Sequence, residues 1–262
     1  MITVLTSFSQ KGYAEYGARF IDTFQKFWPD DIKLLIYHEG QPELGGYDLL
    51  TEVTSCAEFL RVYKDNLIVQ GRAREDGRYW KKDCLQSGYN FRYDAYKFSR
   101  KIFAIEHAAK IVQRGKLFWV DADVVTFNHV TRDFLNRQLP DEVCTSYLGR
   151  VKGYHSECGF VGYNLNQVRC HDFISVFASI YRSGTFMKLA EWHDSWVYDY
   201  VRGQMGISSK NISAPGSSGH VFIQSELGLC MDHLKGDRKQ VGRSYPLNYH
   251  KAPHNHPYWR SQ

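Results

Sequence analysis

Length, composition and charge limit the classes of protein to which this chain can belong. At 262 residues and 30.5 kDa it has room for one large domain with a sizeable core. Hydrophobic residues make up 43% and charged residues 23%, which is ordinary for a globular protein and excludes a low-complexity chain. The net charge of +5 and the pI near 8.8 favour anionic partners, and the aromatic share of 15% permits a carbohydrate or nucleotide partner.

Cysteine spacing and the amino terminus bear on the cellular compartment. No two of the six cysteines form a Cys-x-x-Cys pair, which argues against a structural zinc site and a disulfide framework and fits a reducing cytosol. Residues 1–6 run directly into a strand-like pattern, and no long apolar segment follows. We therefore expect no signal peptide, no integral membrane association and a cytoplasmic location, in the host cytoplasm if the source is viral.

The first part of the chain predicts a βαβ unit. Residues 2–8 and 32–37 are apolar, β-branched runs typical of strands. Between them, aromatic residues recur at helical spacing: Tyr16, Phe20, Phe24 and Phe27. The two strands are therefore expected to be parallel. A nucleotide's base and ribose would lie at their ends, although each polar group there is equally an ordinary loop residue: Thr6, Ser7, Tyr37 and His38.

The patterns over residues 40–88 are weaker. We expect a strand at 47–53, a short helix at 57–64 and a charged, irregular loop at 72–83 that folds over the site. From Asp94, which can cap a helix, apolar residues follow the 3.6-residue period to Val112. The start of this helix is basic, which fits either a diphosphate or a solvated face: Arg92, Lys97, Arg100 and Lys101.

Two carboxylates follow the apolar run at residues 117–120. That run predicts a strand buried on both faces, and Asp121 and Asp123 come directly after it. In an extended chain, residues two apart project to the same side, so the two side chains would converge. Converging carboxylates repel each other unless a cation lies between them. We therefore expect a divalent metal site at this sheet edge; the alternative is an acidic turn.

The second half of the chain continues the α/β pattern. Helices are expected at 131–137 and 170–182, and strands at 143–148 and 159–164, with Glu157 just before the last strand. A polar cluster, Glu191 to Asp194, opens a further helix, and residues 208–219 predict a Ser/Gly/Pro loop. The alternation of strands and helices indicates the α/β fold class.

A histidine, a glycine and a lysine near the end of the chain complete the candidate site. His233 adds a nitrogen ligand to the two aspartates, and such an oxygen/nitrogen set suits Mn²⁺, with Mg²⁺ as the alternative. Gly236 would let the backbone approach a phosphate, and Lys239 would supply positive charge. The other candidates for the nitrogen ligand lack this spacing: His250, His254 and His256.

These motifs resemble those of metal-dependent glycosyltransferases of the GT-A type, most closely the glycogenin-like retaining enzymes. The resemblance covers about the last two-thirds of the chain. It consists of the helix around Lys97, the Asp121-Ala-Asp123 pair, the strand at 159–164, and the His233-x-x-Gly236-x-x-Lys239 motif. It implies the GT-A form of the α/β class, with a mixed, mostly parallel, Rossmann-like central sheet flanked by helices. It also implies one GT-A domain over residues 1–262, with residues 1–125 as the nucleotide-binding half and 126–262 as the acceptor-binding half and tail.

The resemblance also implies a role for each matching residue. Asp121, Asp123 and His233 would bind metal, with Asp121 also contacting the donor; Gly236 and Lys239 would bind the diphosphate; and Asp194 would contact the donor sugar. The chain departs from the family at Ser195, where a Gln is usual, and at Gln240-Val241, where Pro-Trp is usual. The run at 192–194 is also similar to that of blood-group transferases, but the Glu that follows it there is missing.

The predicted function is Mn²⁺-dependent transfer of a hexose or pentose from a nucleotide sugar, expected to be a UDP-sugar, to an acceptor hydroxyl. Lys97 or Arg100 would help Lys239 to neutralise the diphosphate. The configuration is expected to be retained; if it is inverted, Asp194 or Glu157 would be the general base.

The predicted acceptor rests on a general similarity to glycosyltransferases of large phages, some of which modify DNA. Basic segments at 72–82 and 235–243 would follow a phosphate backbone, so a hydroxymethylated pyrimidine in phage DNA is the first hypothesis. A surface glycan or lipopolysaccharide is the alternative. A sugar nucleotidyltransferase ranks lower because the first strand lacks a Gly-rich, Arg-bearing loop, and a non-catalytic nucleic-acid-binding module leaves the paired aspartates without a role.

Overall fold

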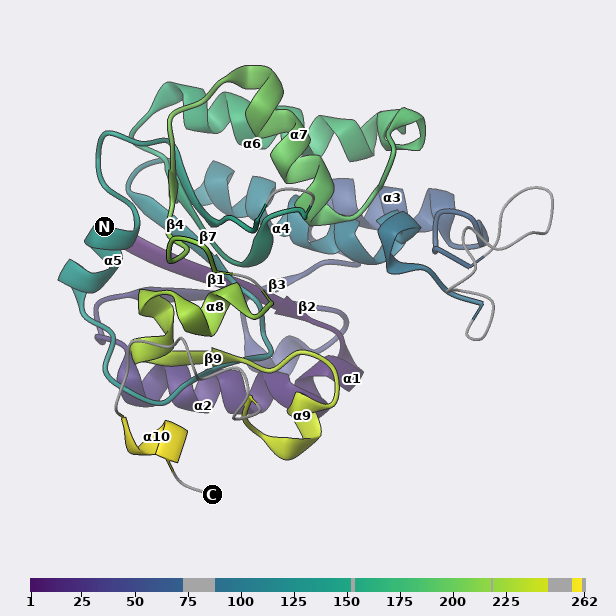
Figure 1. Ribbon diagram of the computed structural model, residues 1–262. Helices are drawn as coiled ribbons and strands as arrows, with labels where there is room; N and C mark the ends of the chain where they lie inside the picture. The colour runs from purple at the N-terminus through teal and green to yellow at the C-terminus, as the bar shows by residue number, and fades with distance from the viewer. Residues whose placement is uncertain (73–87, 152–153, 218, 245–255, 261–262) are drawn as a thin grey trace.

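A seven-stranded sheet forms the centre of the computed structural model, which describes residues 1–72, 88–151, 154–217, 219–244 and 256–260 (Figure 1). The strand order is β3-β2-β1-β4-β7-β6-β8. In chain order these strands are β1 (Ile2–Phe8), β2 (Lys33–His38), β3 (Tyr47–Asp48), β4 (Lys116–Val120), β6 (Thr145–Leu148), β7 (Glu157–Asn164) and β8 (Ser209–Asn211). A separate antiparallel pair joins β5 (Val124–Thr126) to β9 (Met231–His233).

One strand near the middle of the sheet, β7, runs opposite to all the others. Strands β3, β2, β1 and β4 run parallel, β7 runs antiparallel to both β4 and β6, and β8 is parallel to β6. The sheet is therefore mixed and mostly parallel, as the sequence predicts. Since parallel strands end at the same edge, the residues that follow β1, β2 and β4 lie together there.

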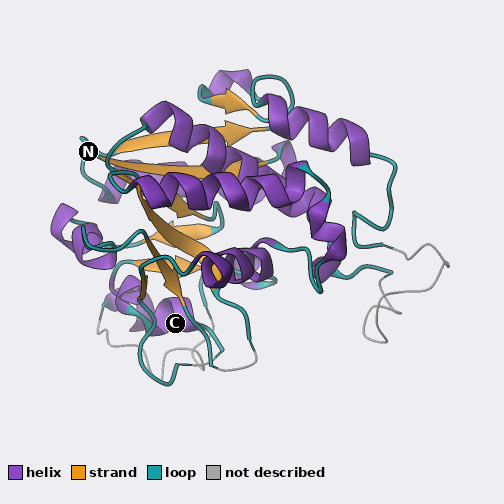
Figure 2. Ribbon diagram, turned by 90° about the horizontal axis from the view of Figure 1, so that it is seen from above, coloured by secondary structure: helices purple, strands orange, loops and turns teal. Residues whose placement is uncertain are grey.

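Helices cover both faces of the sheet. One layer, above the sheet in Figure 1, contains α3 (Thr54–Tyr63), α4 (Ala95–Val112), α6 (Val168–Arg182) and α7 (Asp194–Met205). Figure 2, seen from above, shows long helices lying over and beside the strands. The opposite face carries α2 (Ala18–Phe27) and α8 (Val221–Gln224), and each layer buries its own apolar cluster against the sheet.

Short elements connect these layers. The shorter helices are α1 (Gln10–Gly12), α5 (Arg132–Gln138), α9 (Arg238–Val241) and α10 (Pro257–Arg260). Single turns of π or 3₁₀ helix lie at Tyr13–Gly17, Pro42–Leu44, Phe91–Tyr93, Thr185–Lys188 and Glu226–Leu229. Among the described helices, none is both long enough and apolar enough to cross a lipid bilayer.

Most predicted elements are present, and two predictions were wrong. The strand expected at 47–53 has only two residues, because the Asp48 side chain accepts a hydrogen bond from the Leu50 N–H and its carbonyl from the Glu52 N–H, which turns the chain toward α3. The loop expected at 208–219 begins with the edge strand β8. The helix cap is confirmed: Asp94 accepts from the Lys97 N–H at 2.8 Å.

A residue of the central strand β4 can test how much core packing contributes to the stability of the fold. All its residues are buried, and the Phe118 ring packs on Phe160 of β7 with 5.3 Å between ring centroids. We expect Phe118→Ala to lower the free energy of unfolding by about 3–5 kcal/mol, because it removes apolar burial and leaves a cavity. Urea denaturation measures the change. Leu50→Ala, at a side chain that is 43% exposed, should change it by less than ~0.5 kcal/mol; equal losses would contradict this view of the core.

Candidate active site

A cavity of about 850 Å³ lies where β1 and β4 end. Its walls come from segments far apart in the chain: the residues after β1, the start of α4, the turn after β4, the start of β7, the start of α7, and β9 with the loop that follows it. Most of the predicted site residues line it: Ser7, Lys97, Arg100, Asp121, Asp123, Glu157, Asp194, His233, Gly236 and Lys239.

A tight turn, rather than an extended strand, brings the two aspartates into the cavity. Strand β4 stops at Val120, and the Asp121 N–H donates to the Gly159 carbonyl of β7 at 2.9 Å. The Val124 N–H then donates back to the Asp121 carbonyl at 3.0 Å, which closes a turn around Asp123. The predicted convergence is therefore present, but its geometric reason is a turn and not the alternation of an extended chain.

His233 meets both aspartates. It ends β9, opposite Val124 of β5, so the β5–β9 pair places it beside the turn. Its Nε2 atom lies 3.0 Å from Asp123 Oδ1 and 3.6 Å from Asp121 Oδ2. Burial alone would raise the pKa of Asp123, but His233 and Lys239 hold it well below its usual range. The three residues predicted as metal ligands thus share one point, although 110 residues separate Asp123 from His233.

Glu157 lies on the other side of the same imidazole. Its Oε1 atom is 3.5 Å from His233 Nδ1, a buried nitrogen that has no hydrogen-bond partner in the described part of the chain. Both carboxylate oxygens accept from Lys235 at 2.6 Å, and Arg150 also pairs with Glu157. Burial opposes ionisation, yet Lys235, His233 and Arg150 lower the pKa of Glu157. Glu157 is the first residue of β7, not a residue before it.

This donor set fits a divalent ion. One ligand atom each from Asp121, Glu157 and His233 lies within 4.8 Å of the other two, and Asp123 contacts the same imidazole. Carboxylate oxygens with a single imidazole are a usual environment for Mn²⁺, and Mg²⁺ accepts the oxygens. Gly159 makes the close approach possible, since a Cβ there would lie 2.4 Å from His233 Cε1.

Lys101 joins the aspartate pair to Asp194. Its Nζ atom is 3.1 Å from Asp121 Oδ1 and 2.8 Å from Asp194 Oδ2. Burial would lower the pKa of Lys101, but the two carboxylates outweigh that effect and raise it. In turn, Lys101 holds the pKa of the buried Asp194 carboxyl below its usual range despite burial. In the sequence, Lys101 was identified only as one of the basic residues at the start of this helix.

The other predicted donor-binding residues differ in their surroundings. Lys239 Nζ lies 3.0 Å from Asp123 Oδ2 and 4.4 Å from the centre of the Tyr16 ring. Gly236 has a φ of +62°, a left-handed conformation that favours glycine. Arg100 is paired with Glu39 at 2.9 Å. Lys97 is exposed and makes no ion pair within the described residues.

Two of the predicted donor contacts, Thr6 and Tyr37, do not line the cavity. Both side chains are fully buried. The Tyr37 ring packs on Tyr47 in the core, and its hydroxyl pairs with His107 Nδ1 at 3.0 Å. Packing in the core, rather than contact with a ligand, therefore explains the positions of these two side chains.

The described tail also excludes one alternative ligand. His256 packs on Phe127, 5.0 Å between ring centroids, and does not line the cavity. His250, His254 and residues 73–82 of the predicted basic loop lie outside the described residues.

Comparisons with known proteins agree with this architecture. No protein-family model matches the sequence, and no curated protein matches it either. Among solved structures, mouse xyloside xylosyltransferase 1 is similar over 81% of this chain and 85% of its own, with a TM-score of 0.50 and 8% identity. A glycosyltransferase involved in the glycosylation of the major capsid of PBCV-1 is similar over 92% and 98%, with a TM-score of 0.50 and 11% identity.

The chain has the GT-A fold. The mixed sheet and its flanking helices match those of both glycosyltransferases over most of each chain. The turn at residues 121–124, called the acidic turn below, follows β4. Within this GT-A fold it lies at the carboxyl edge of the parallel strands, where open α/β sheets bind ligands.

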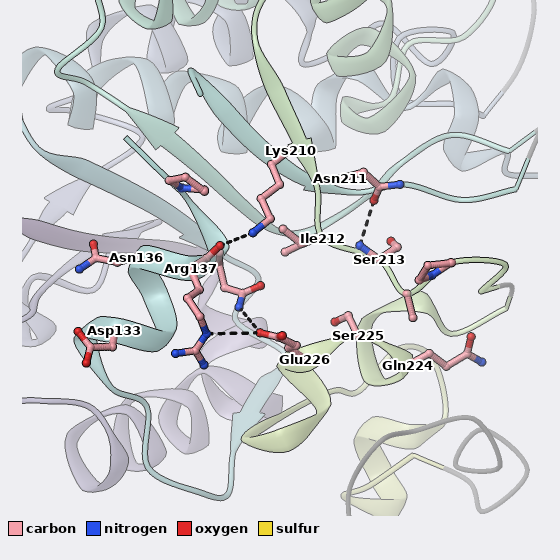
Figure 3. A pocket seen from close by; sticks show the side chains of 14 residues that line it. Asp133, Asn136, Arg137, Lys210, Asn211, Ile212, Ser213, Gln224, Ser225 and Glu226 are labelled. Atoms are coloured by element: carbon pink, nitrogen blue, oxygen red, sulfur yellow. Dashed lines mark hydrogen bonds and ion pairs between the residues drawn. The ribbon is translucent and has the colours of Figure 1, made fainter. Parts of the chain in front are cut away.

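A second cavity, of about 920 Å³, lies elsewhere on the GT-A fold, between α5, β8 and α8 (Figure 3). Its charged groups largely satisfy one another: Lys210 Nζ donates to the Arg137 carbonyl, and Arg137 lies 4.0 Å from Glu226. The described residues that line it include none of the predicted site residues. The acidic turn therefore marks the first cavity as the candidate active site.

The close packing of Gly159 on His233 predicts a specific effect on metal binding. A methyl group in Gly159→Ala would displace the imidazole, so we expect the affinity for Mn²⁺, measured by isothermal titration calorimetry, to fall by about 10–100-fold. Gly203→Ala in α7 is the control, because its added Cβ would meet open space; it should keep the affinity. Circular dichroism confirms folding, and an unchanged affinity in folded Gly159→Ala would show that this imidazole does not bind the ion.

Proposed function

We propose that this protein is a metal-dependent glycosyltransferase that transfers a sugar from a nucleotide-sugar donor to an acceptor hydroxyl. One observation carries the proposal: Asp121, Asp123 and His233 converge at the carboxyl edge of a GT-A sheet. The basic side chains and Asp194 that a donor diphosphate and sugar require line the same cavity. In this proposal, residues 1–125 contribute mainly to nucleotide binding, and residues 126–262 to the acceptor side.

The diphosphate would bind between the acidic turn and the loop after β9. Lys239 contacts Asp123 and also lines the cavity, so its ammonium group is placed to bind a phosphate oxygen. The backbone at Gly236 carries no side chain to obstruct this approach. Mn²⁺, or Mg²⁺, held by Asp121, Asp123 and His233 would supply positive charge to the leaving diphosphate.

The nucleoside would lie against the end of β1, where Ser7, Phe8 and Tyr16 line the cavity. Tyr16 offers an aromatic ring and Ser7 offers a hydroxyl, which suits a base and a ribose. We infer a UDP-sugar as donor, carrying a hexose or a pentose. The neighbour named xyloside xylosyltransferase 1 is consistent with the pentose.

Asp194 would orient the donor sugar. Lys101 keeps it ionised and fixes one oxygen, so the carboxylate can accept hydrogen bonds from sugar hydroxyls. The same pairing makes it a weak base, and Glu157 is a weak base for the same reason. Since an inverting enzyme needs a base with a higher pKa, these two environments support retention of configuration.

Glu157 is better explained as a positioning residue than as the general base predicted from the sequence. It faces His233 Nδ1, the nitrogen turned away from the aspartates. A carboxylate on that side of the ring electrostatically favours a proton on Nδ1, which leaves Nε2 free to bind a metal. Lys235 and Arg150 occupy the carboxylate, which leaves no oxygen free for an acceptor proton.

The acceptor end of the cavity favours a glycan. Phe91 and Tyr154, both lining the cavity, are 50% and 70% exposed, and exposed rings beside polar groups suit the apolar face of a sugar. The hydroxymethylated-DNA acceptor has less support, because Lys235 and Lys239 of the basic segment at 235–243 point to acidic residues of the cavity. Both acceptors remain distinguishable by experiment.

The metal site can be tested through hydrolysis of the donor. With several nucleotide sugars and Mn²⁺, the wild type should release free sugar slowly. Asp123→Asn should reduce this rate on the order of 100-fold, because it replaces a charged metal ligand with a neutral side chain of nearly equal size. Asp172→Asn, an exposed position on α6, is the control and should keep the rate. Full activity in a folded Asp123→Asn protein would refute the site.

The acceptor class can be tested by competition between substrates. We expect transfer of labelled sugar to oligosaccharides and none to hydroxymethylated DNA. Tyr154→Ala should raise the acceptor KM roughly tenfold, through loss of about 1–1.5 kcal/mol of stacking, while donor hydrolysis stays the same. Met187→Ala, 48% exposed on another surface, is the control. Transfer to hydroxymethylated DNA alone would restore the DNA hypothesis.

A further inference from the structure

A second group of potential metal ligands lines the same cavity at a distance from the acidic turn. Ligand atoms of His155, Glu191 and His193 all lie within 4.8 Å of one another. Glu191 Oε2 is 2.9 Å from His193 Nε2 and 3.6 Å from His155 Nε2. One carboxylate oxygen thus faces two imidazole nitrogens, and the site proposed for the donor uses none of the three side chains.

The surrounding contacts fix the orientation of these groups. Arg92 pairs with the other carboxylate oxygen, Oε1, at 3.3 Å, which leaves Oε2 directed at the imidazoles. The Trp192 N–H donates to the Arg92 carbonyl at 2.7 Å and ties the two segments together. The His193 ring packs between Phe91 and Phe98, at 5.5 and 6.0 Å between centroids. An ion pair, a backbone hydrogen bond and ring contacts therefore hold these side chains in place without a bound ligand.

A carboxylate lies on the side of the second ring nitrogen of His193. Asp194 Oδ1 lies 3.9 Å from His193 Nδ1, the nitrogen opposite the one that faces Glu191. Histidines that bind metal usually present their second nitrogen to a carboxylate, which orients the ring. The other oxygen of Asp194 is paired with Lys101, so this ammonium group separates the histidine group from the aspartate pair.

We propose that His155, Glu191 and His193 form a second cation site, distinct from the acidic turn and specific for a divalent transition metal of the zinc type. Two imidazoles and one carboxylate are a common ligand set for Zn²⁺ with an open coordination position. This set differs from the oxygen-rich turn, which favours Mn²⁺ or Mg²⁺. All three side chains line the cavity, so the open position faces the cavity. The proposal does not depend on the transfer reaction.

Zinc binding in a protein that lacks the acidic-turn ligands isolates the second site. In an Asp121→Asn/Asp123→Asn background, stripped with chelator, competition with a chromophoric zinc chelator should show one bound Zn²⁺ per chain. Adding His155→Ala or Glu191→Gln should weaken this binding by about 100-fold or more, since each removes a ligand. Adding His129→Ala, an exposed histidine elsewhere, should leave it unchanged. Circular dichroism of each variant confirms folding.

Three results would overturn the proposal. They are no zinc binding in the background protein, unchanged affinity in both folded ligand variants, and equal loss in the His129→Ala control. Zinc-edge anomalous scattering from crystals soaked in Zn²⁺ provides a second measurement, with a peak expected among the three side chains. Because the readout is binding, failure here leaves the glycosyltransferase proposal intact, and absence of sugar transfer leaves the zinc site intact.

Discussion

The contact between His233 and three carboxylates is the constraint on which the candidate active site depends. One nitrogen of this buried ring faces Asp121 and Asp123, and the other faces Glu157. Like charges at such separations repel strongly when water is excluded, so each carboxylate needs a cationic partner. Lys101, Lys235 and Lys239 provide one for each acid, which explains why lysines from two distant segments enter one cavity. A divalent ion could bind in addition to these lysines. Asp121 and Asp123 each direct one oxygen to a lysine and the other toward His233.

The reversal of one strand explains how Glu157 joins the aspartates. Because β7 runs antiparallel to β4, the first residues of β7 lie beside the last residues of β4, with Val120 opposite Phe160. In an all-parallel sheet the start of the neighbouring strand would lie at the opposite edge, about five residues or some 16 Å away. The backbone bond from the Asp121 N–H to the Gly159 carbonyl then fixes the acidic turn to β7. Strand direction, and not sequence proximity, therefore decides which acids meet.

The sequence predicted the parts of this structure that depend on local patterns. The first strand and the Asp94 cap follow from apolar periodicity and capping chemistry, and both are confirmed. The mixed sheet, also confirmed, was implied by the resemblance to GT-A enzymes. The spacing of His233, Gly236 and Lys239 predicted that they act together, and all three line the cavity. Their roles remain predictions. The bridging position of Lys101 could not be predicted, because it depends on Asp194 from a helix packed against α4. Tyr37 shows the converse: its place at a strand end was predicted, but packing of α4 on the sheet buries it.

In the proposed reaction, ion pairing within the cavity would link donor binding to metal binding. Lys239 lies 3.0 Å from Asp123 Oδ2, and in the proposed complex a divalent ion at that carboxylate would free the ammonium group to bind a phosphate more fully. Lys101 is different: it is buried between two acids and can remain between them throughout. We infer that Lys239 exchanges partners while Lys101 keeps a fixed scaffold charge. Binding of the diphosphate and of the divalent ion should then be mutually reinforcing, because each compensates the charge that the other exposes.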